Sequence, residues 1–137
     1  MNKNFLEIDN VTFKMGGNSK VNNVSFSIEN EGDIICLLGP SGIGKTTILR
    51  SIAGLEKIAS GKIKLKGKII SSKKINIEPE DRNISLSFQE NSLFPHYTVE
   101  KNIYLGTERK NKNSKKKINP KKIIKLLNII KILDKYP

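Results

Sequence analysis

Gly39-Pro40-Ser41-Gly42-Ile43-Gly44-Lys45-Thr46 is a glycine-rich octapeptide whose two flanks differ in pattern. The apolar run at residues 34–38 precedes it, and an unbroken run of this length predicts a strand buried on both faces. Residues 47–53 follow it with apolar side chains at helical spacing, and Gly54 can end that helix. The predicted order is therefore strand, glycine-rich loop, helix.

The octapeptide has the composition of a phosphate-binding loop. Glycines let the backbone curl so that successive N–H groups point into one concavity that holds phosphate oxygens. The following helix adds its unpaired N–H groups and the positive end of its dipole. Lys45 can then reach the β- and γ-phosphates of a nucleotide, and the Thr46 hydroxyl can bind the accompanying Mg²⁺. A glycine-rich turn with a chance lysine is the alternative, and both flanks argue against it.

Length and composition limit the class of protein. The chain has 137 residues, enough for one domain with a hydrophobic core. No apolar run reaches the roughly 18 residues of a membrane-spanning helix, so we expect neither such a helix nor a secretory leader. The single cysteine, Cys36, lies in the apolar run, which predicts a buried thiol and a reducing compartment.

The net charge of +12 is concentrated in one part of the chain. Residues 1–100 carry 13 basic and 11 acidic side chains, whereas residues 101–137 carry 12 basic and 2 acidic ones. No aromatic side chains interleave with the lysines of residues 109–125 to stack on bases. The pattern favours a solvated basic linker and helix face, so nucleic acid is not expected to be a partner.

Alternation of apolar and polar residues predicts further strands. The lysines of residues 62–66 suit a half-exposed edge strand, which is expected to continue as a hairpin. The last predicted strand ends near Gln89. The predicted strands cover residues 5–13, 24–28, 62–66 and 84–88.

A polar, charged segment at residues 107–117 is followed by one more predicted helix. Asn119 and Pro120 supply an N-cap and a first helical residue. Five apolar residues then fall on one stripe that the helix is expected to bury: Ile123, Leu126, Leu127, Ile130 and Leu133.

Several segments together have the pattern of one family. They are L-E-I-D-N-V-T-F at 6–13, V-S-F-S-I at 24–28, L-L-G-P-S-G-I-G-K-T-T-I-L-R-S-I-A-G-L-E at 37–56, S-G-K-I at 60–63, P-E-D-R-N-I-S-L-S-F-Q-E at 79–90 and L-F-P-H-Y-T-V-E-K-N-I at 93–103. The octapeptide alone indicates only a P-loop NTPase. With the other segments, the chain resembles the N-terminal half of an ABC transporter ATP-binding subunit, of the importer type that energises uptake of sugars, polyamines, sulfate, iron or thiamine.

The resemblance implies an incomplete α/β fold, with an antiparallel β subdomain and the beginnings of a parallel P-loop core and of a helical subdomain. The implied domains are residues 1–106, a charged linker at 107–117 and the start of the helical subdomain at 118–137. The implied function is ATP binding and, in the full-length protein, hydrolysis that powers solute import. The implied partners are integral-membrane permease subunits and a second ATP-binding subunit in a homodimer, at the cytoplasmic face of the cell membrane.

The resemblance also assigns roles to single residues. Residues Gly39 to Thr46 would wrap the phosphates of ATP, with Thr47 near the α-phosphate. Gln89 would contact Mg²⁺ or the attacking water, so Thr46 and Gln89 are the implied metal contacts. An ordinary polar residue at a strand end is the alternative for Gln89. Residues 90–98 would face the membrane partner.

Two departures from the family pattern change what is expected of this chain. Met15 stands where the family usually stacks an aromatic residue on adenine, which predicts weaker nucleotide binding and less base selection. Phe13, two positions earlier, is expected to lie on the same face and partly substitute for the missing aromatic residue.

The second departure is the absence of the family's remaining motifs. The sequence does not contain the L-S-G-G-Q signature, the strand with a Mg²⁺-binding Asp and a catalytic Glu, or the switch histidine. The chain is expected to stop just short of the signature, and to lack ATPase activity alone.

Two other classes of function stay open. A different P-loop enzyme, such as a GTPase or a small-molecule kinase, would share the octapeptide, although no N-K-x-D guanine motif occurs. The other open class is a non-enzymatic role, either a remnant that only binds partners or a basic nucleic-acid-binding module. A steep loss of RNA or DNA binding with salt would support the nucleic-acid version. Nucleotide preference tests the P-loop enzyme, and co-purification with a membrane permease would favour an importer subunit.

Overall fold

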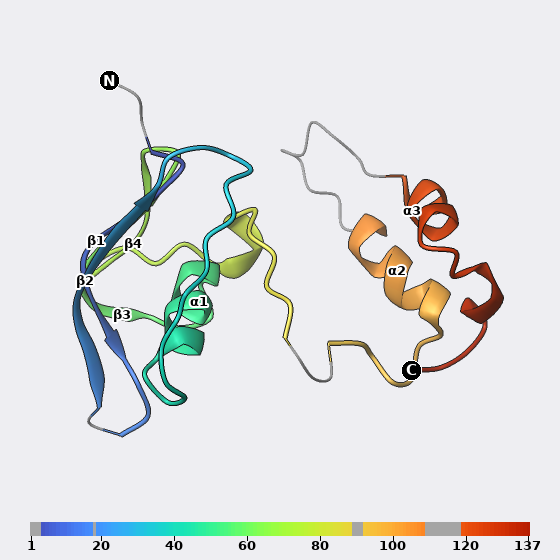
Figure 1. The fold of residues 1–137 in the computed structure, drawn as a ribbon, viewed down its shortest axis with the longest axis horizontal. Coiled ribbons are helices and arrows are strands. Elements are labelled where there is room, and N and C mark those ends of the chain that lie inside the picture. The colour runs from blue at the N-terminus through green and yellow to red at the C-terminus, as the bar shows by residue number, and fades with distance from the viewer. Residues whose placement is uncertain (1–3, 18, 89–91, 109–118) are drawn as a thin grey trace. The chain divides into compact units, whose positions relative to one another are not determined.

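The computed structural model describes residues 4–17, 19–88, 92–108 and 119–137. The chain forms two compact units, one through Leu86 and one from Ser87 onward. In the first unit an antiparallel sheet packs against helix α1 (Lys45–Ala53), whereas the second unit is helical (Figure 1). No helix in the described part of the chain is long and apolar enough to cross a membrane.

The sheet of the first unit has four strands in the order β2-β1-β3-β4, and all neighbours are antiparallel. The predictions of strands at 5–13 and 24–28 and of the hairpin are confirmed, although β2 begins four residues early. The edge position predicted for 62–66 is wrong, because β4 covers the outer side of β3. The strand bounds are Leu6–Lys14 (β1), Lys20–Ile28 (β2), Ile58–Leu65 (β3) and Lys68–Ser72 (β4).

A β-bulge explains why the alternation of β1 is imperfect. Asn10 has a φ of 48°, and Gly61 opposite it on β3 has a φ of 85°. The register of β1 against β2 shifts between Ile8 and Val11. The extra residue turns both of these side chains to the same face, where they are 2% and 0% exposed.

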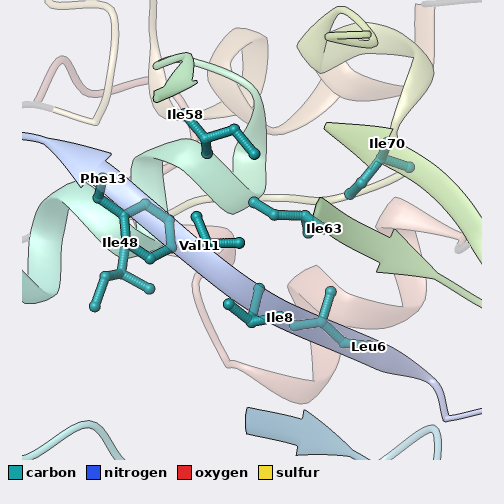
Figure 2. Packing of buried hydrophobic residues seen from close by; sticks show 8 residues of the cluster. All are labelled: Leu6, Ile8, Val11, Phe13, Ile48, Ile58, Ile63 and Ile70. Carbon is teal, nitrogen blue, oxygen red and sulfur yellow. The ribbon is translucent and has the colours of Figure 1, made fainter. Parts of the chain in front are cut away.

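The hydrophobic core lies between one face of the sheet and α1 (Figure 2). Strands β1, β3 and β4 contribute most of it, and Ile48 reaches in from the helix. This packing fixes α1 on the sheet, and with it the loop that precedes the helix. The buried cluster consists of Leu6, Ile8, Val11, Phe13, Ile48, Ile58, Ile63 and Ile70.

Residues 34–38 do not form the predicted buried strand. Ile34 is 96% exposed, Leu38 is 86% exposed, and the Cys36 thiol is exposed as well. The predictions of a doubly buried strand and a buried thiol are therefore wrong. The physical reason is pairing: a strand of this kind needs neighbours on both sides, and no strand in the described residues pairs with it.

The segment at 84–88 likewise forms no strand. Ile84 is partly buried against the core, but Phe88 is 43% exposed. The prediction of a strand here is wrong for the same reason, since no described strand lies beside it to receive its hydrogen bonds. Gln89, at its predicted end, lies outside the described residues.

The second unit is organised around helix α2 (Val99–Glu108), which the sequence analysis did not predict. The N–H groups of Val99 and Glu100 donate to the carbonyl oxygens of Lys135 and Leu133, at 2.8 and 2.9 Å. The last residues of the chain thus close onto the first turn of α2. Part of the predicted linker, residues 107–108, is helical, and the rest of it lies outside the described residues.

Helix α3 (Pro120–Leu126) begins as predicted and ends earlier, followed by a 3₁₀ turn at Ile130–Ile132. The Asn119 side chain accepts a hydrogen bond from the N–H of Lys121 at 3.0 Å. Asn128 has a left-handed φ of 54°, so the helical stripe cannot continue. The prediction that the stripe is buried is wrong: Ile124 is the buried residue, and Leu126 is 81% exposed.

Candidate nucleotide-phosphate site

The amino end of α1 and the glycine-rich loop meet at one place. Gly44 is the N-cap of α1 with a φ of 104°, and Gly39 and Gly42 have φ values of 152° and 79°. Residues with a Cβ adopt such angles only at a cost. No side chain caps α1, and its first turn holds no acidic residue. The free N–H groups of that turn and the positive end of the helix dipole are therefore directed to the loop.

Lys45, the first residue of α1, folds its side chain back onto the loop. Its Nζ donates to the carbonyl oxygen of Gly39 at 2.6 Å and to that of Pro40 at 2.8 Å. The ammonium therefore lies beside the loop. A phosphate has to compete with two carbonyl oxygens for it.

Met15 directly follows β1 and lies against the glycine-rich loop. A Cβ on Gly44 would lie 3.0 Å from Met15 Sδ and closer still to Val21 Cγ2. Gly44 is therefore required both for its backbone angle and for space. The structure thus places Met15 next to the octapeptide, where the resemblance expects the residue that contacts the base. Phe13 is completely buried in the core, so the prediction that it partly substitutes beside a base is wrong.

The two threonines after Lys45 differ in exposure. Thr46 is exposed, so its hydroxyl is accessible to a cation, whereas Thr47 is half-buried. Ser41 and Ile43 are exposed on the loop as well. Gln89, the other predicted metal contact, falls outside the described residues. The structure therefore brings together Met15 and residues 39–47 and leaves Gln89 a prediction.

Asn102, to which the sequence analysis gave no role, holds the segment that precedes α2. Its Oδ1 accepts the N–H of Phe94 at 2.8 Å, and its Nδ2 donates to the carbonyl oxygens of Phe94, Tyr97 and Thr98, each at 3.1 Å. One side chain thus fixes most of the turn at residues 94–98. Its position four residues after Thr98, one helical turn into α2, is the signal that could have revealed this role.

The segment held by Asn102 exposes apolar and aromatic side chains. Leu93 and Phe94 are each 52% exposed. The His96 ring lies 4.3 Å from the Tyr97 ring and 5.8 Å from the Phe94 ring, centroid to centroid. Exposed apolar clusters of this kind are characteristic of surfaces that contact another protein.

Comparison with known proteins gives consistent matches. Residues 21–137 match the family model for ABC transporters. The chain is 36% identical over 138 aligned positions to an Fe(3+) ions import ATP-binding protein of Haemophilus influenzae, which aligns with all of this chain and with 38% of the relative. It is 40% identical over 133 positions to a probable sulfate/thiosulfate import ATP-binding protein of Chlorella vulgaris, covering 95% of this chain and 53% of the relative.

A similar fold occurs in a solved nucleotide-free ATP-binding cassette from an ABC transporter. The TM-score is 0.72 at 26% identity, over 97% of this chain and 57% of that chain. The chain therefore spans about half the length of the proteins it matches, or less. These matches confirm the expected fold class, an ABC ATPase fold that is partly present here. The chain belongs to the family of ABC transporter ATP-binding proteins.

Proposed function

We propose that residues 39–47 bind the phosphates of Mg-ATP, and that the whole protein powers solute import as the ATP-binding subunit of an ABC transporter. One observation carries the proposal: three glycines with left-handed φ, the amino end of α1 and the Lys45 ammonium meet at one loop. Relatives whose names describe import ATP-binding proteins support it.

Backbone groups do most of the binding in this proposal. The N–H groups of the loop and of the first turn of α1 receive the phosphate oxygens. Lys45 exchanges the carbonyl oxygens of Gly39 and Pro40 for oxygens of the β- and γ-phosphates. The exposed Thr46 hydroxyl suits Mg²⁺, because this ion keeps several waters and phosphate oxygens and needs few protein ligands. When bound, Mg²⁺ neutralises charge on the phosphates; Gln89 is the second proposed contact.

The proposed partners are permease subunits and a second ATP-binding subunit, at the cytoplasmic face of the membrane. The exposed Leu93 and Phe94 support a permease contact at residues 92–98, and Asn102 holds the backbone of Phe94 in place. A shape held by hydrogen bonds before binding loses less entropy when the partner docks. Met15 is proposed to pack against the base, with less contact area than an aromatic ring provides.

Nuclear magnetic resonance titration of the 137-residue chain with Mg-ATP tests the proposal. We expect the amide signals of Gly42, Gly44 and Lys45 to shift with a dissociation constant on the order of 1 mM, about −4 kcal/mol. Mg-free adenosine should leave them in place, because the phosphates carry the binding. The same titration with Mg-GTP tests for the nucleotide preference that another class of P-loop enzyme, such as a GTPase, would show. Shifts confined to the lysines of residues 119–137 would contradict a phosphate site at the loop.

We expect no ATP turnover by the 137-residue chain alone. Its sequence holds neither the L-S-G-G-Q signature nor an apolar strand that ends in Asp-Glu, the features to which the family resemblance assigns hydrolysis. Phosphate release should equal that of protein-free buffer. A Lys45→Ala sample purified in parallel would reveal a contaminating ATPase. Turnover near the ordinary enzyme rate of about 10 s⁻¹, lost in that variant, would disprove the expectation.

A further inference from the structure

Arg82 is a buried cation in the first unit that no sequence pattern singles out. It is 2% exposed, although it directly follows the 3₁₀ turn Pro79–Asp81, whose acidic residues suggest a solvated loop. Burial of an arginine requires that its donors be satisfied, because an unpaired buried charge is strongly unfavourable. Its partners therefore show what holds it there.

One edge of the guanidinium binds the carboxyl end of α1. Nη1 donates to the carbonyl oxygen of Ser51 at 2.9 Å and to that of Ile52 at 3.0 Å. Carbonyls in the last turn of a helix lack intrahelical partners and carry the negative end of its dipole. A cation is the partner that suits both properties.

The remaining donors bind groups outside α1. Nη2 donates to Ser71 Oγ on β4 and to Asn76 Oδ1, each at 2.8 Å. Nε donates to the carbonyl oxygen of Ile77 at 2.7 Å. Because the guanidinium is planar and rigid, these bonds fix both the distance and the angle between the end of α1 and the sheet.

The guanidinium packs closely against Gly54. A Cβ on Gly54, the C-cap of α1, would lie 2.5 Å from Nε and 2.9 Å from Cζ of Arg82. Burial lowers the pKa of the Arg82 guanidinium from its ordinary value, and the nearby Glu78 charge partly opposes this change. Arginine stays protonated even so, and the end of α1 keeps its cation.

We propose that Arg82 is a positioning residue for the phosphate loop: it sets where α1 lies on the sheet, and therefore where the amino end of α1 presents its N–H groups. The inference rests on the proposed phosphate site at residues 39–47. Helix α1 is nine residues long. At about 1.5 Å per residue it is a short rigid rod, so displacement of one end moves the other. Errors of about 1 Å in the placement of binding groups have large effects.

The variant Arg82→Lys tests the proposal, with Arg50→Lys as the matched control. Lysine keeps the charge but cannot bind Ser51, Ile52 and Ser71 in one plane. Arg50 lies on the same helix, and its Nε pairs with Glu56 Oε1 at 2.6 Å at a partly exposed site. In titrations of the 137-residue chain we expect Arg82→Lys to bind Mg-ATP about tenfold more weakly, and Arg50→Lys to bind like the wild type.

Sheet amide signals establish that each variant is folded. A folded Arg82→Lys chain with wild-type affinity would overturn the proposal. If Arg82 only stabilised the fold, the Arg82→Lys chain would bind Mg-ATP with unchanged affinity at temperatures where it is fully folded. The affinity of the folded fraction therefore separates the two roles.

A second measurement on the wild type needs no variant, and it decides the matter if Arg82→Lys does not fold. Coupling between two sites is reciprocal, so Mg-ATP at the loop must strengthen the Arg82 bonds if those bonds favour Mg-ATP. We expect solvent exchange of the Arg82 Nε–H to slow several-fold on titration with Mg-ATP. An unchanged rate while Gly42 and Gly44 signals shift would overturn the positioning role alone. A wild-type chain whose loop signals do not shift would overturn the phosphate site, and the positioning role with it.

Discussion

Replacing Lys45 by alanine should weaken Mg-ATP binding about a hundredfold. A charge-assisted hydrogen bond to phosphate contributes up to about 3 kcal/mol, and each 1.4 kcal/mol is tenfold in affinity. The loss concerns binding more than folding, because among the described residues the hydrogen bonds of Lys45 Nζ go to the exposed loop carbonyls of Gly39 and Pro40. Both carbonyl oxygens lie on the exposed loop, so water can replace the ammonium as their partner in the variant.

The measurement is the shift of the Gly42 and Gly44 amides at a fixed, high Mg-ATP concentration. The wild-type loop should be mostly occupied there and the variant largely empty. Lys57→Ala is the control, because Lys57 is exposed just beyond α1 and its loss changes the net charge equally. Equal weakening by both variants would mean that general charge attraction, and not the loop, binds the nucleotide.

Replacing Gly61 by alanine should destabilise the first unit by about 3 kcal/mol. Gly61 has a φ of 85°, and a left-handed conformation alone costs alanine about 1–2 kcal/mol. The new Cβ would also lie 2.6 Å from Val11 Cα and 2.6 Å from the carbonyl carbon of Asn10. Both atoms are backbone, so β1 and β3 have to separate at the bulge, and overpacking of this kind adds about 1–3 kcal/mol.

Denaturant unfolding followed by circular dichroism measures this effect as a lower midpoint. Gly16→Ala is the matched control, because nothing lies within 4 Å of its added Cβ and its φ is not left-handed. Domains of this size are stable by only about 5–15 kcal/mol, so the Gly61 variant should lose a large share of its stability. Equal midpoints for the two variants would show that the bulge relaxes without separating the strands.

Local chemistry made the loop and its helix predictable. The glycines, Lys45 and the capping Gly54 each act within a few residues of the chain, and the structure places α1 at Lys45–Ala53 as the spacing indicates. The N-cap at Asn119 was predictable for the same reason. Strands β1 and β2 were predictable because both show apolar alternation and because they pair with each other as neighbours in the sequence.

Features that depend on distant partners were not predictable. The segment at 34–38 has the composition of a buried strand, but composition does not specify whether a neighbour pairs with it. Arg82 binds five groups, yet the sequence around it, with Glu80, Asp81 and Asn83, is as polar as that of an exposed turn. Its role follows from burial and bond geometry, which a single sequence does not display.

The exposed thiol of Cys36 gives the open segment at 34–38 a chemical reporter. It is the single cysteine of the chain and lies three residues before Gly39. A maleimide or a disulfide reagent would therefore modify the protein at one known point beside the glycine-rich loop. In any longer form of the polypeptide, the modification rate would report whether another strand has come to cover this segment, fast when it is open and slow when it is covered.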